Sequence, residues 1–173
     1  MHLRQPLDLH HPIGITTRHT EVDGKLEVME AIRRLETGDW DQWLPLWRGY
    51  LDFYRAEVSE PTTRATFDRL TGADGAMFGL IAVGGDDAGS GLAHCIVHPT
   101  TWSRRPYCYL EDLFVAPASR GSDLGRNLLE AAKKESEGRG AGRLYWHTQQ
   151  YNGRARSLYD QVGRVTSFMV YEM

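Results

Sequence analysis

A glycine-bearing loop between an apolar strand and an apolar-striped helix has the residue types and spacing suited to anion binding. It runs Val115-Ala116-Pro117-Ala118-Ser119-Arg120-Gly121-Ser122-Asp123-Leu124-Gly125-Arg126. Such a loop directs free backbone N–H groups and the positive end of the helix dipole at one point, which favours phosphate oxygens. Arg120 and Arg126 flank the loop, and their guanidinium groups suit a pyrophosphate. The alternative from these residues alone is a plain turn with surface arginines.

The charges divide the chain into a basic and an acidic part. The whole sequence has 20 Lys and Arg against 23 Asp and Glu. From Arg120 to Arg156 there are eight basic and four acidic residues, whereas the rest has 12 basic and 19 acidic residues. This division suits an anionic cofactor on one side and a cationic substrate on the other.

A second candidate site is the acidic pair Glu111-Asp112 inside an otherwise apolar segment. Carboxylates are disfavoured in strands, so a polar environment or a function must account for them. Regular alternation predicts that Glu111 shares one strand face with Tyr109, and that Asp112 shares the other with Leu110. The alternative is that both carboxylates are solvated or paired for structural reasons.

Two histidines on the preceding strand are weaker candidates. His94 and His98 share one strand face and are possible relay groups, but no third ligand accompanies them in the sequence. Ordinary strand histidines are therefore the preferred interpretation.

Hydrophobic periodicity predicts the elements that position these residues. Residues 26–35 are interpreted as a strand, with a short helix as the alternative. A helix capped by Asp39 follows, with Asp39 and Gln42 as a capping-box pair. The further expected elements are a helix over 63–70, strands over 76–83, 92–98 and 107–115, a helix over 122–139, a strand over 144–148, a helix over 152–163 and a strand over 166–171. This order predicts the mixed α/β class, with a mostly antiparallel central sheet flanked by helices.

Length and composition favour one globular domain. The chain has 173 residues, of which 41% are hydrophobic and 25% charged. Residues 1–25 lack periodicity and hold four of the seven histidines, so we expect a flexible N-terminal arm before a single domain over 26–173. The histidines of the arm have no Cys or paired carboxylate at ligand spacing, and no metal site is predicted.

Several classes of protein are disfavoured. A net charge of −3 argues against a nucleic-acid binder held by bulk charge. The apolar runs fall well short of the roughly 18 residues that a membrane span needs, and a signal peptide is not expected. Cys95 and Cys108 are interpreted as reduced thiols, which predicts a cytoplasmic protein.

Three motifs in the correct order resemble the GCN5-related N-acetyltransferases. They are Tyr109-Leu110-Glu111-Asp112-Leu113-Phe114-Val115, then Arg120-Gly121-Ser122-Asp123-Leu124-Gly125, then Asn152 through Ala155 to Leu158-Tyr159. That family has a phosphate motif Arg/Gln-x-x-Gly-x-Gly/Ala and a later motif Asn-x-x-Ala-x-x-Leu-Tyr. The resemblance covers residues 26–173 and is greatest to the branch that acetylates polyamines or histone-type lysines.

The resemblance implies an N-acetyltransferase that uses acetyl-coenzyme A and a primary amine, either a polyamine-like small cation or a protein lysine. Direct transfer in a ternary complex is expected, because no activated nucleophile is evident. No nucleic-acid or membrane partner is expected. A homodimer is possible, with the strand over 166–171 pairing across its interface.

The same resemblance assigns roles to individual residues. Glu111 is the candidate base, because a protonated amine must lose a proton before it attacks. Tyr159 is implied to be the general acid for the departing thiolate, with a core aromatic as the alternative. In the family a bulge in this strand provides an oxyanion donor, and that donor maps to Phe114 or Val115. The implied cofactor-binding set is Phe114, Val115, Arg120, Gly121, Ser122, Asp123, Leu124, Gly125, Arg126 and Asn152, in which Asn152 binds the pantetheine arm.

Asp123 departs from the family pattern, because the middle glycine of the phosphate motif usually stands there. A carboxylate facing the pyrophosphate would add like-charge repulsion, whereas one that faces away would only favour the helix start. Asp123 is the feature in favour of an alternative function, a non-catalytic acyl-coenzyme A binding or sensing domain. Glu111 and Tyr159 count against that alternative.

Overall fold

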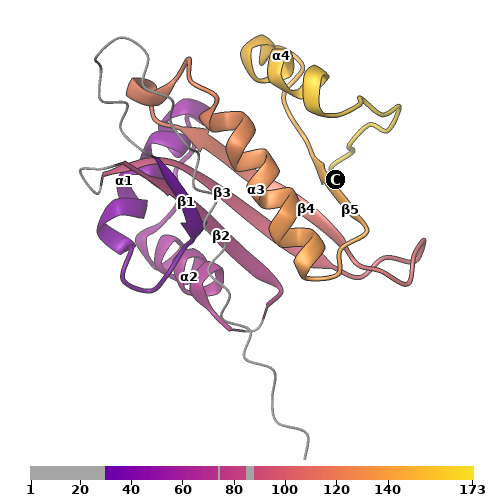
Figure 1. Cartoon of the computed structure of the whole chain (residues 1–173), viewed down its shortest axis with the longest axis horizontal. Coiled ribbons are helices and arrows are strands. Elements are labelled where there is room, and N and C mark those ends of the chain that lie inside the picture. The colour runs from indigo at the N-terminus through magenta and orange to yellow at the C-terminus, as the bar shows by residue number, and fades with distance from the viewer. Residues whose placement is uncertain (1–29, 74, 85–87) are drawn as a thin grey trace, which may run out of the picture.

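The computed structural model describes residues 30–73, 75–84 and 88–173, so the arm expected over 1–25 lies outside the described residues. Figure 1 shows a central sheet with helices on both faces. The elements in chain order are β1 (Ala31–Arg34), α1 (Trp40–Tyr54), α2 (Glu60–Thr71), β2 (Met77–Val83), β3 (Gly89–His98), β4 (Tyr107–Val115), the short 3₁₀ helix η1 (Pro117–Ser119), α3 (Leu124–Gly138), β5 (Arg143–Trp146) and α4 (Gly153–Val162).

The sheet has the order β1-β2-β3-β4-β5. Its first three pairings are antiparallel and the last, between β4 and β5, is parallel. The parallel pair needs a crossover, and α3 supplies it. The predicted mixed α/β class with a mostly antiparallel sheet is therefore confirmed.

Each face of the sheet has its own hydrophobic core. On one face α3 packs on Phe78, Cys95, Cys108 and Leu110, with α4 at the edge of the cluster. On the other face α1 and α2 cover Ile81, Leu92 and Phe114. Figure 1 shows α3 lying across its face of the sheet, with α1 and α2 on the far side. Both cysteines are buried free thiols on the neighbouring strands β3 and β4.

Helix α1 carries a row of aromatic rings from the core to the end of the helix. Trp43 stacks on Trp47, Trp47 stacks on Tyr50, and Tyr50 contacts Tyr54, with ring centroids 5.8, 5.5 and 4.9 Å apart. Trp43 and Trp47 are buried, whereas the two tyrosines are half-buried. The helical spacing of these side chains thus places the tyrosines where the core opens toward solvent.

The start of α1 differs from its predicted capping. Asp39 lies at the N-cap position, but its side chain makes no cap hydrogen bond. Its two carboxylate oxygens accept hydrogen bonds from the Arg33 guanidinium at 2.6 and 2.8 Å, and one of them also accepts from the Glu36 N–H. The capping-box prediction with Gln42 is wrong, because a bidentate arginine engages both oxygens.

The strand expected over residues 166–171 is absent from the structure. Residues 164–173 form neither helix nor strand, and Phe168, Met169 and Val170 are exposed. Alternating apolar residues produced the prediction, but a strand also needs a neighbour for its backbone hydrogen bonds. No strand of the described residues pairs with this segment.

An ion cluster around the buried Glu135 connects α3 to the edge strand β1. The Glu135 carboxylate accepts a hydrogen bond from Arg139 Nε at 2.8 Å, and Arg34 Nε lies 3.8 Å away. Arg139 also donates to the Gly75 carbonyl and lies over the Phe78 ring. The cluster thereby fixes the C-terminal end of α3 against β1 and β2.

Replacing Glu135 with Ala is expected to lower the free energy of unfolding by about 1–3 kcal/mol. The variant leaves the Arg34 and Arg139 guanidinium groups close together without their carboxylate. Urea denaturation measures the loss, and Glu137→Ala is the matched control because its pair with Lys133 is exposed. The control should change by no more than about 0.5 kcal/mol. Equal effects of the two variants would contradict the proposed role of the cluster.

Candidate active site

Strands β4 and β5 separate part-way along their length. Parallel pairing joins residues 107–110 of β4 to β5 and then stops. Within the part of the chain that the structure describes, residues 112–115 of β4 pair only with β3. The Ala116 N–H donates to the Ser90 carbonyl of β3, so strand alternation turns the N–H groups of Leu113 and Val115 toward the open edge. This edge can pair with an extended ligand chain.

A β-bulge lies at Glu111. His94 of β3 is opposite Asp112, and the next residue, Cys95, is opposite Leu110, so Glu111 is the extra residue on β4. The bulge reverses the alternation: Leu110 packs on the α3 side, whereas Phe114 packs on the α1 side. The prediction that Asp112 shares a face with Leu110 is therefore wrong. The bulge that the resemblance implied for this strand is present, and it lies at Glu111.

Glu111 is exposed at this bulge, next to the open edge. Partial burial of its carboxyl group, first, and the negative charge of Asp112, second, raise the pKa of Glu111. A raised pKa makes the carboxylate a stronger base, provided that the solution pH keeps it ionised.

Sequence reasoning missed the surroundings of Asp112. The Asp112 carboxylate accepts a hydrogen bond from His94 Nδ1 at 2.9 Å, and Trp43 Nε1 donates to His94 Nε2 at 2.9 Å. All three residues are buried. The available signal was a polar His94 within an apolar strand. The pairing register that joins it to Asp112 requires knowledge of the bulge.

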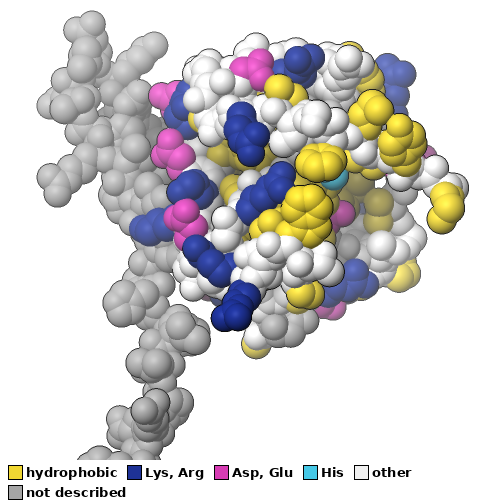
Figure 2. Space-filling model, turned by 90° about the vertical axis from the view of Figure 1, so that its right-hand side faces the viewer, with side chains coloured by type: hydrophobic (Ala, Val, Ile, Leu, Met, Phe, Trp, Pro, Cys, Tyr) yellow, Lys and Arg dark blue, Asp and Glu magenta, His cyan; other side chains and the backbone are white. Residues whose placement is uncertain are grey.

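Tyrosines surround the same carboxylate. Burial raises the pKa of Tyr50 and of Tyr54, and the charge of Asp112 raises both further. Burial and the charges of Glu111 and Asp112 raise the pKa of Tyr109. The Tyr109 hydroxyl lies 3.3 Å from His147 Nδ1. Figure 2 looks onto the side of the molecule that carries β5 and shows hydrophobic side chains gathered there, with Lys and Arg beside them.

The loop before α3 has the geometry expected of an anion site. Gly121 has a φ of 96°, which only glycine adopts readily, and the Ser122 hydroxyl accepts a hydrogen bond from the Leu124 N–H. Over the described residues, no acceptor pairs with the backbone N–H groups of Gly125 and Arg126. Asp123 is exposed with an ordinary φ of −77°, so its backbone does not require glycine.

Gly125 has a packing role that the sequence did not indicate. A Cβ at this position would lie 3.2 Å from Leu158 of α4. The glycine therefore lets α4 approach the start of α3 closely, next to the candidate anion site. Leu124 is buried in the core beneath it.

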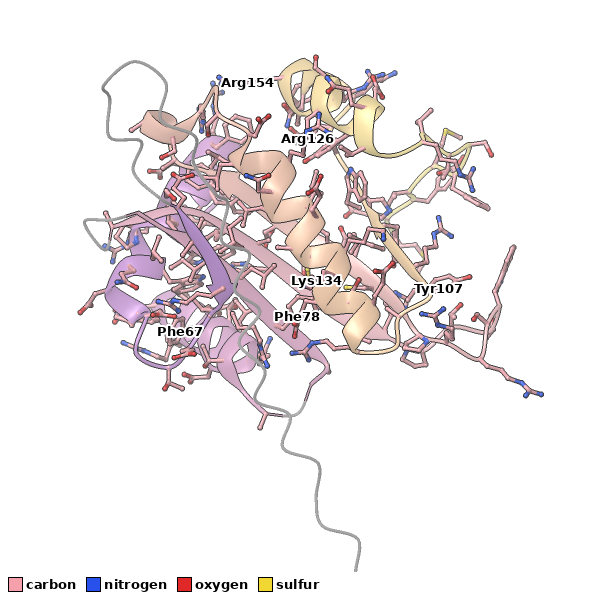
Figure 3. All side chains as sticks on the ribbon, in the orientation of Figure 1. Phe67, Phe78, Tyr107, Arg126, Lys134 and Arg154 are labelled. Atoms are coloured by element: carbon pink, nitrogen blue, oxygen red, sulfur yellow. The ribbon has the colours of Figure 1, made fainter. Side chains whose placement is uncertain are left out.

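The two arginines of the loop contact the protein itself. Arg120 Nε donates to the Val115 carbonyl at 3.0 Å, and its guanidinium lies 5.6 Å from the centroid of the Phe114 ring. Arg126 donates to Gln161 of α4 at 2.6 Å, and that contact is exposed. Figure 3 shows Arg126 at the end of α3 that lies beside α4. Both guanidinium groups thus lie near the loop, and each already donates a hydrogen bond within the protein.

Helix α4 carries Asn152 at its N-cap position and Tyr159 about two turns further on. The Asn152 side chain accepts a hydrogen bond from the Ala155 N–H at 3.3 Å, which confirms its predicted capping role. The Tyr159 ring packs against Trp146 of β5 at a centroid distance of 5.3 Å. Burial, with a smaller contribution from Tyr54, raises the pKa of Tyr159 to about 12. The hydroxyl therefore stays protonated at neutral pH.

This arrangement can bind an anionic, extended cofactor and move protons beside it. Unpaired N–H groups at the start of α3 suit a pyrophosphate, and the open edge of β4 suits an extended amide-bearing arm. A base and a protonated phenol stand near that edge. The combination is typical of enzymes that transfer an acyl group from coenzyme A.

The comparisons with known proteins agree with this class. A profile of the Acetyltransferase (GNAT) family matches residues 40–163. The chain belongs to this family and is an acetyl-coenzyme A–dependent N-acetyltransferase. The resemblance seen in the sequence motifs is confirmed at the level of the family.

Two curated relatives and one solved structure illustrate the likeness. The chain is 28% identical over 143 residues to the D-amino-acid N-acetyltransferase HPA3 of Saccharomyces cerevisiae, over 82% of this chain and 89% of the relative. It is 33% identical to the thialysine N-epsilon-acetyltransferase of Caenorhabditis elegans, over 52% of this chain and 55% of the relative. The fold matches an aminoglycoside N-acetyltransferase, AAC(6')-Iy, in complex with CoA, with a TM-score of 0.76, 17% identity and coverage of 88% and 98%.

The described residues contain no group of three or more His, Cys, Asp or Glu side chains that could hold a metal ion. Over the same residues, no helix is both long and apolar enough to cross a bilayer.

Proposed function

We propose that the protein acetylates the primary amine of a polyamine-like small cation or of a protein lysine. The observation that carries this proposal is the pair of carboxylates, Glu111 and Asp112, at the open edge of β4 with tyrosine rings around them. Among the described residues, no lysine or arginine forms an ion pair with either carboxylate. A cationic acceptor would supply the missing positive charge. The relative named thialysine N-epsilon-acetyltransferase supports an amine of lysine type.

We assign the proton transfers to two side chains in a direct, ternary-complex reaction. Glu111 takes a proton from the acceptor ammonium, and the amine then attacks the acetyl carbon that the bound thioester supplies. The Val115 N–H, at the open edge, donates to the negative charge that develops on the acetyl oxygen. Tyr159 gives a proton to the sulfur as the carbon–sulfur bond breaks. The attacking nitrogen loses its extra proton to water, and Tyr159 regains a proton from water.

The cofactor-binding part of the proposal follows the loop and α4. Arg120, Gly121, Ser122, Leu124, Gly125 and Arg126 would hold the pyrophosphate through backbone N–H groups and guanidinium charge, with Asp123 at the same turn. Asn152 would bind the pantetheine arm along β4, next to residues 113–115. The supporting observations are the positive φ of Gly121 and the unpaired N–H groups that follow it within the described residues.

Asp123→Asn should tighten coenzyme A binding about two- to fivefold, because it removes one negative charge near the pyrophosphate and keeps the size of the side chain. Isothermal titration calorimetry at low salt measures the change, and added salt should shrink it. Asp123→Gly is the companion variant, because it also removes the side chain. Unchanged affinity in both variants would mean that the carboxylate faces away from the phosphates.

A thiol-release assay tests the proposed substrate class. Acetyl-coenzyme A is mixed with 1,5-diaminopentane, spermidine, a lysine peptide, a D-amino acid or an aminoglycoside. We expect release of free thiol with the diamine, the polyamine or the peptide. Turnover only with the D-amino acid or the aminoglycoside would overturn the proposed class. Coenzyme A binding without turnover on any of these amines would likewise overturn the proposed class.

We further propose a cytoplasmic homodimer. The exposed apolar side chains of Phe168, Met169 and Val170 and the short edge strand β5 support an interface, although no strand forms over 166–171. The free thiols Cys95 and Cys108 fit a reducing compartment. Analytical ultracentrifugation tests the dimer, and a monomer at micromolar concentration would contradict it.

A further inference from the structure

The buried contacts of His94 determine where its proton lies. An indole N–H can only donate, so His94 Nε2 must accept the hydrogen bond from Trp43 at 2.9 Å. The proton of the neutral ring is then on Nδ1, which faces Asp112 Oδ2 at 2.9 Å. Trp43 therefore selects the Nδ1–H tautomer, and His94 donates to the carboxylate.

This tautomer leaves the Asp112 charge uncompensated. A neutral imidazole satisfies one carboxylate oxygen without cancelling its charge. In the described part of the chain no lysine or arginine pairs with Asp112, and only 9% of the residue is exposed. A buried, unpaired carboxylate is costly, so a cation that reaches it is bound strongly.

The position of Asp112 directs that attraction to the reaction site. The bulge at Glu111 turns Asp112 toward α1, where its charge acts on Tyr50, Tyr54 and Tyr109. Tyrosine faces add cation–π attraction for an ammonium group. Glu111, the next residue along β4, lies at the open edge.

We propose that Trp43 and His94 are positioning residues, which hold Asp112 as a fixed negative charge that draws the acceptor ammonium group to Glu111. The inference rests on the proposed function, a cationic amine acceptor. It adds residues that touch neither acceptor nor cofactor and act only through Asp112.

Imidazole ¹⁵N NMR of the wild-type protein at neutral pH tests the proton arrangement without any activity. His94, assigned with the His94→Asn variant, should show a protonated Nδ1 and an unprotonated Nε2. An Nε2–H tautomer, or a ring protonated at both nitrogens, would overturn the inference even if the enzyme acetylates amines as proposed.

Steady-state kinetics with 1,5-diaminopentane and acetyl-coenzyme A test the consequence. His94→Leu removes the donor to Asp112 and should raise the KM for the diamine at least tenfold, with the KM for acetyl-coenzyme A unchanged. His94→Asn should stay within about threefold of wild type, because its side-chain amide can replace Nδ1–H as donor. Equal KM values in both variants and wild type, or equal losses for both substrates, would overturn the inference.

A pair of tryptophan variants repeats the test with smaller changes to the core. Trp43→Phe removes the N–H that selects the tautomer and should raise the diamine KM severalfold. Trp47→Phe is the matched control, because the Trp47 N–H points to Thr63 at 3.4 Å instead of to His94. If His94→Leu fails to fold, the two tryptophan variants and the NMR spectrum still test the positioning role of Trp43 and His94. Equal diamine KM values for the two tryptophan variants would contradict the inference, whereas a wild type that acetylates no amine would contradict the proposed function.

Discussion

Glu111→Gln is expected to lower kcat by about 10²–10³-fold, in the range that a positioned general base contributes. The amide keeps the size and polarity of the side chain at the bulge but cannot take a proton from the acceptor. Coenzyme A affinity should not change, because Glu111 lies away from the α3 loop. The measurement is a thiol-release rate with saturating diamine, alongside calorimetry of coenzyme A binding.

Two further observations would separate a base from a structural residue. Glu130→Gln, at an exposed glutamate on α3, is the control and should leave kcat unchanged. If Glu111→Gln retained more than half of the wild-type kcat, Glu111 would not be the base. A loss that accompanied a lower free energy of unfolding would likewise point to structure.

The pH profile gives an independent prediction for the same residue. The base must be ionised, so the rate should fall as the pH decreases through the pKa of Glu111. Partial burial and the charge of Asp112 raise that pKa above 4.5, so the acid limb should lie above the position of an ordinary glutamate. Asp112→Asn removes the like charge and should move the limb to lower pH. If the acid limb of Asp112→Asn stayed at the wild-type pH, Asp112 would not be a cause of the raised pKa of Glu111.

The sequence predicted most of the elements because their signals are local. Apolar spacing predicted α3 and α4, and the strand pattern predicted β2, β3 and β4. The order of these elements was sufficient for the fold class. Pairing partners are not local, however, which is why residues 166–171 were predicted as a strand that the structure lacks.

The residue types of the candidate site could be predicted from the sequence, but the strand faces on which these side chains lie could not. Regular alternation was applied to β4, whereas the extra residue at Glu111 places Asp112 beside His94 and α1. A bulge has no signature in this segment, because its cause is the pairing with β3. The links from Trp43 to His94 and from Arg120 to Val115 likewise join positions that only the folded chain brings together.

Tyr159→Phe is expected to lower kcat by about 10–10²-fold, with little change in coenzyme A affinity. The variant keeps the ring that packs against Trp146 and removes only the hydroxyl, so the fold should be retained. Without that proton donor the thiolate must leave as an anion. Tyr151→Phe is the control, because Tyr151 is 81% exposed, and its kcat should not change.

The shape of the pH profile distinguishes an acid from a packing residue. Burial raises the pKa of Tyr159 to about 12, so the hydroxyl does not change its protonation between pH 6 and 10. The variant should therefore lower the rate by the same factor across this range and leave the acid limb, which belongs to Glu111, in place. A factor that varied with pH would assign the proton donor to another group. An unchanged rate would leave Tyr159 with only the packing role that its contact with Trp146 provides.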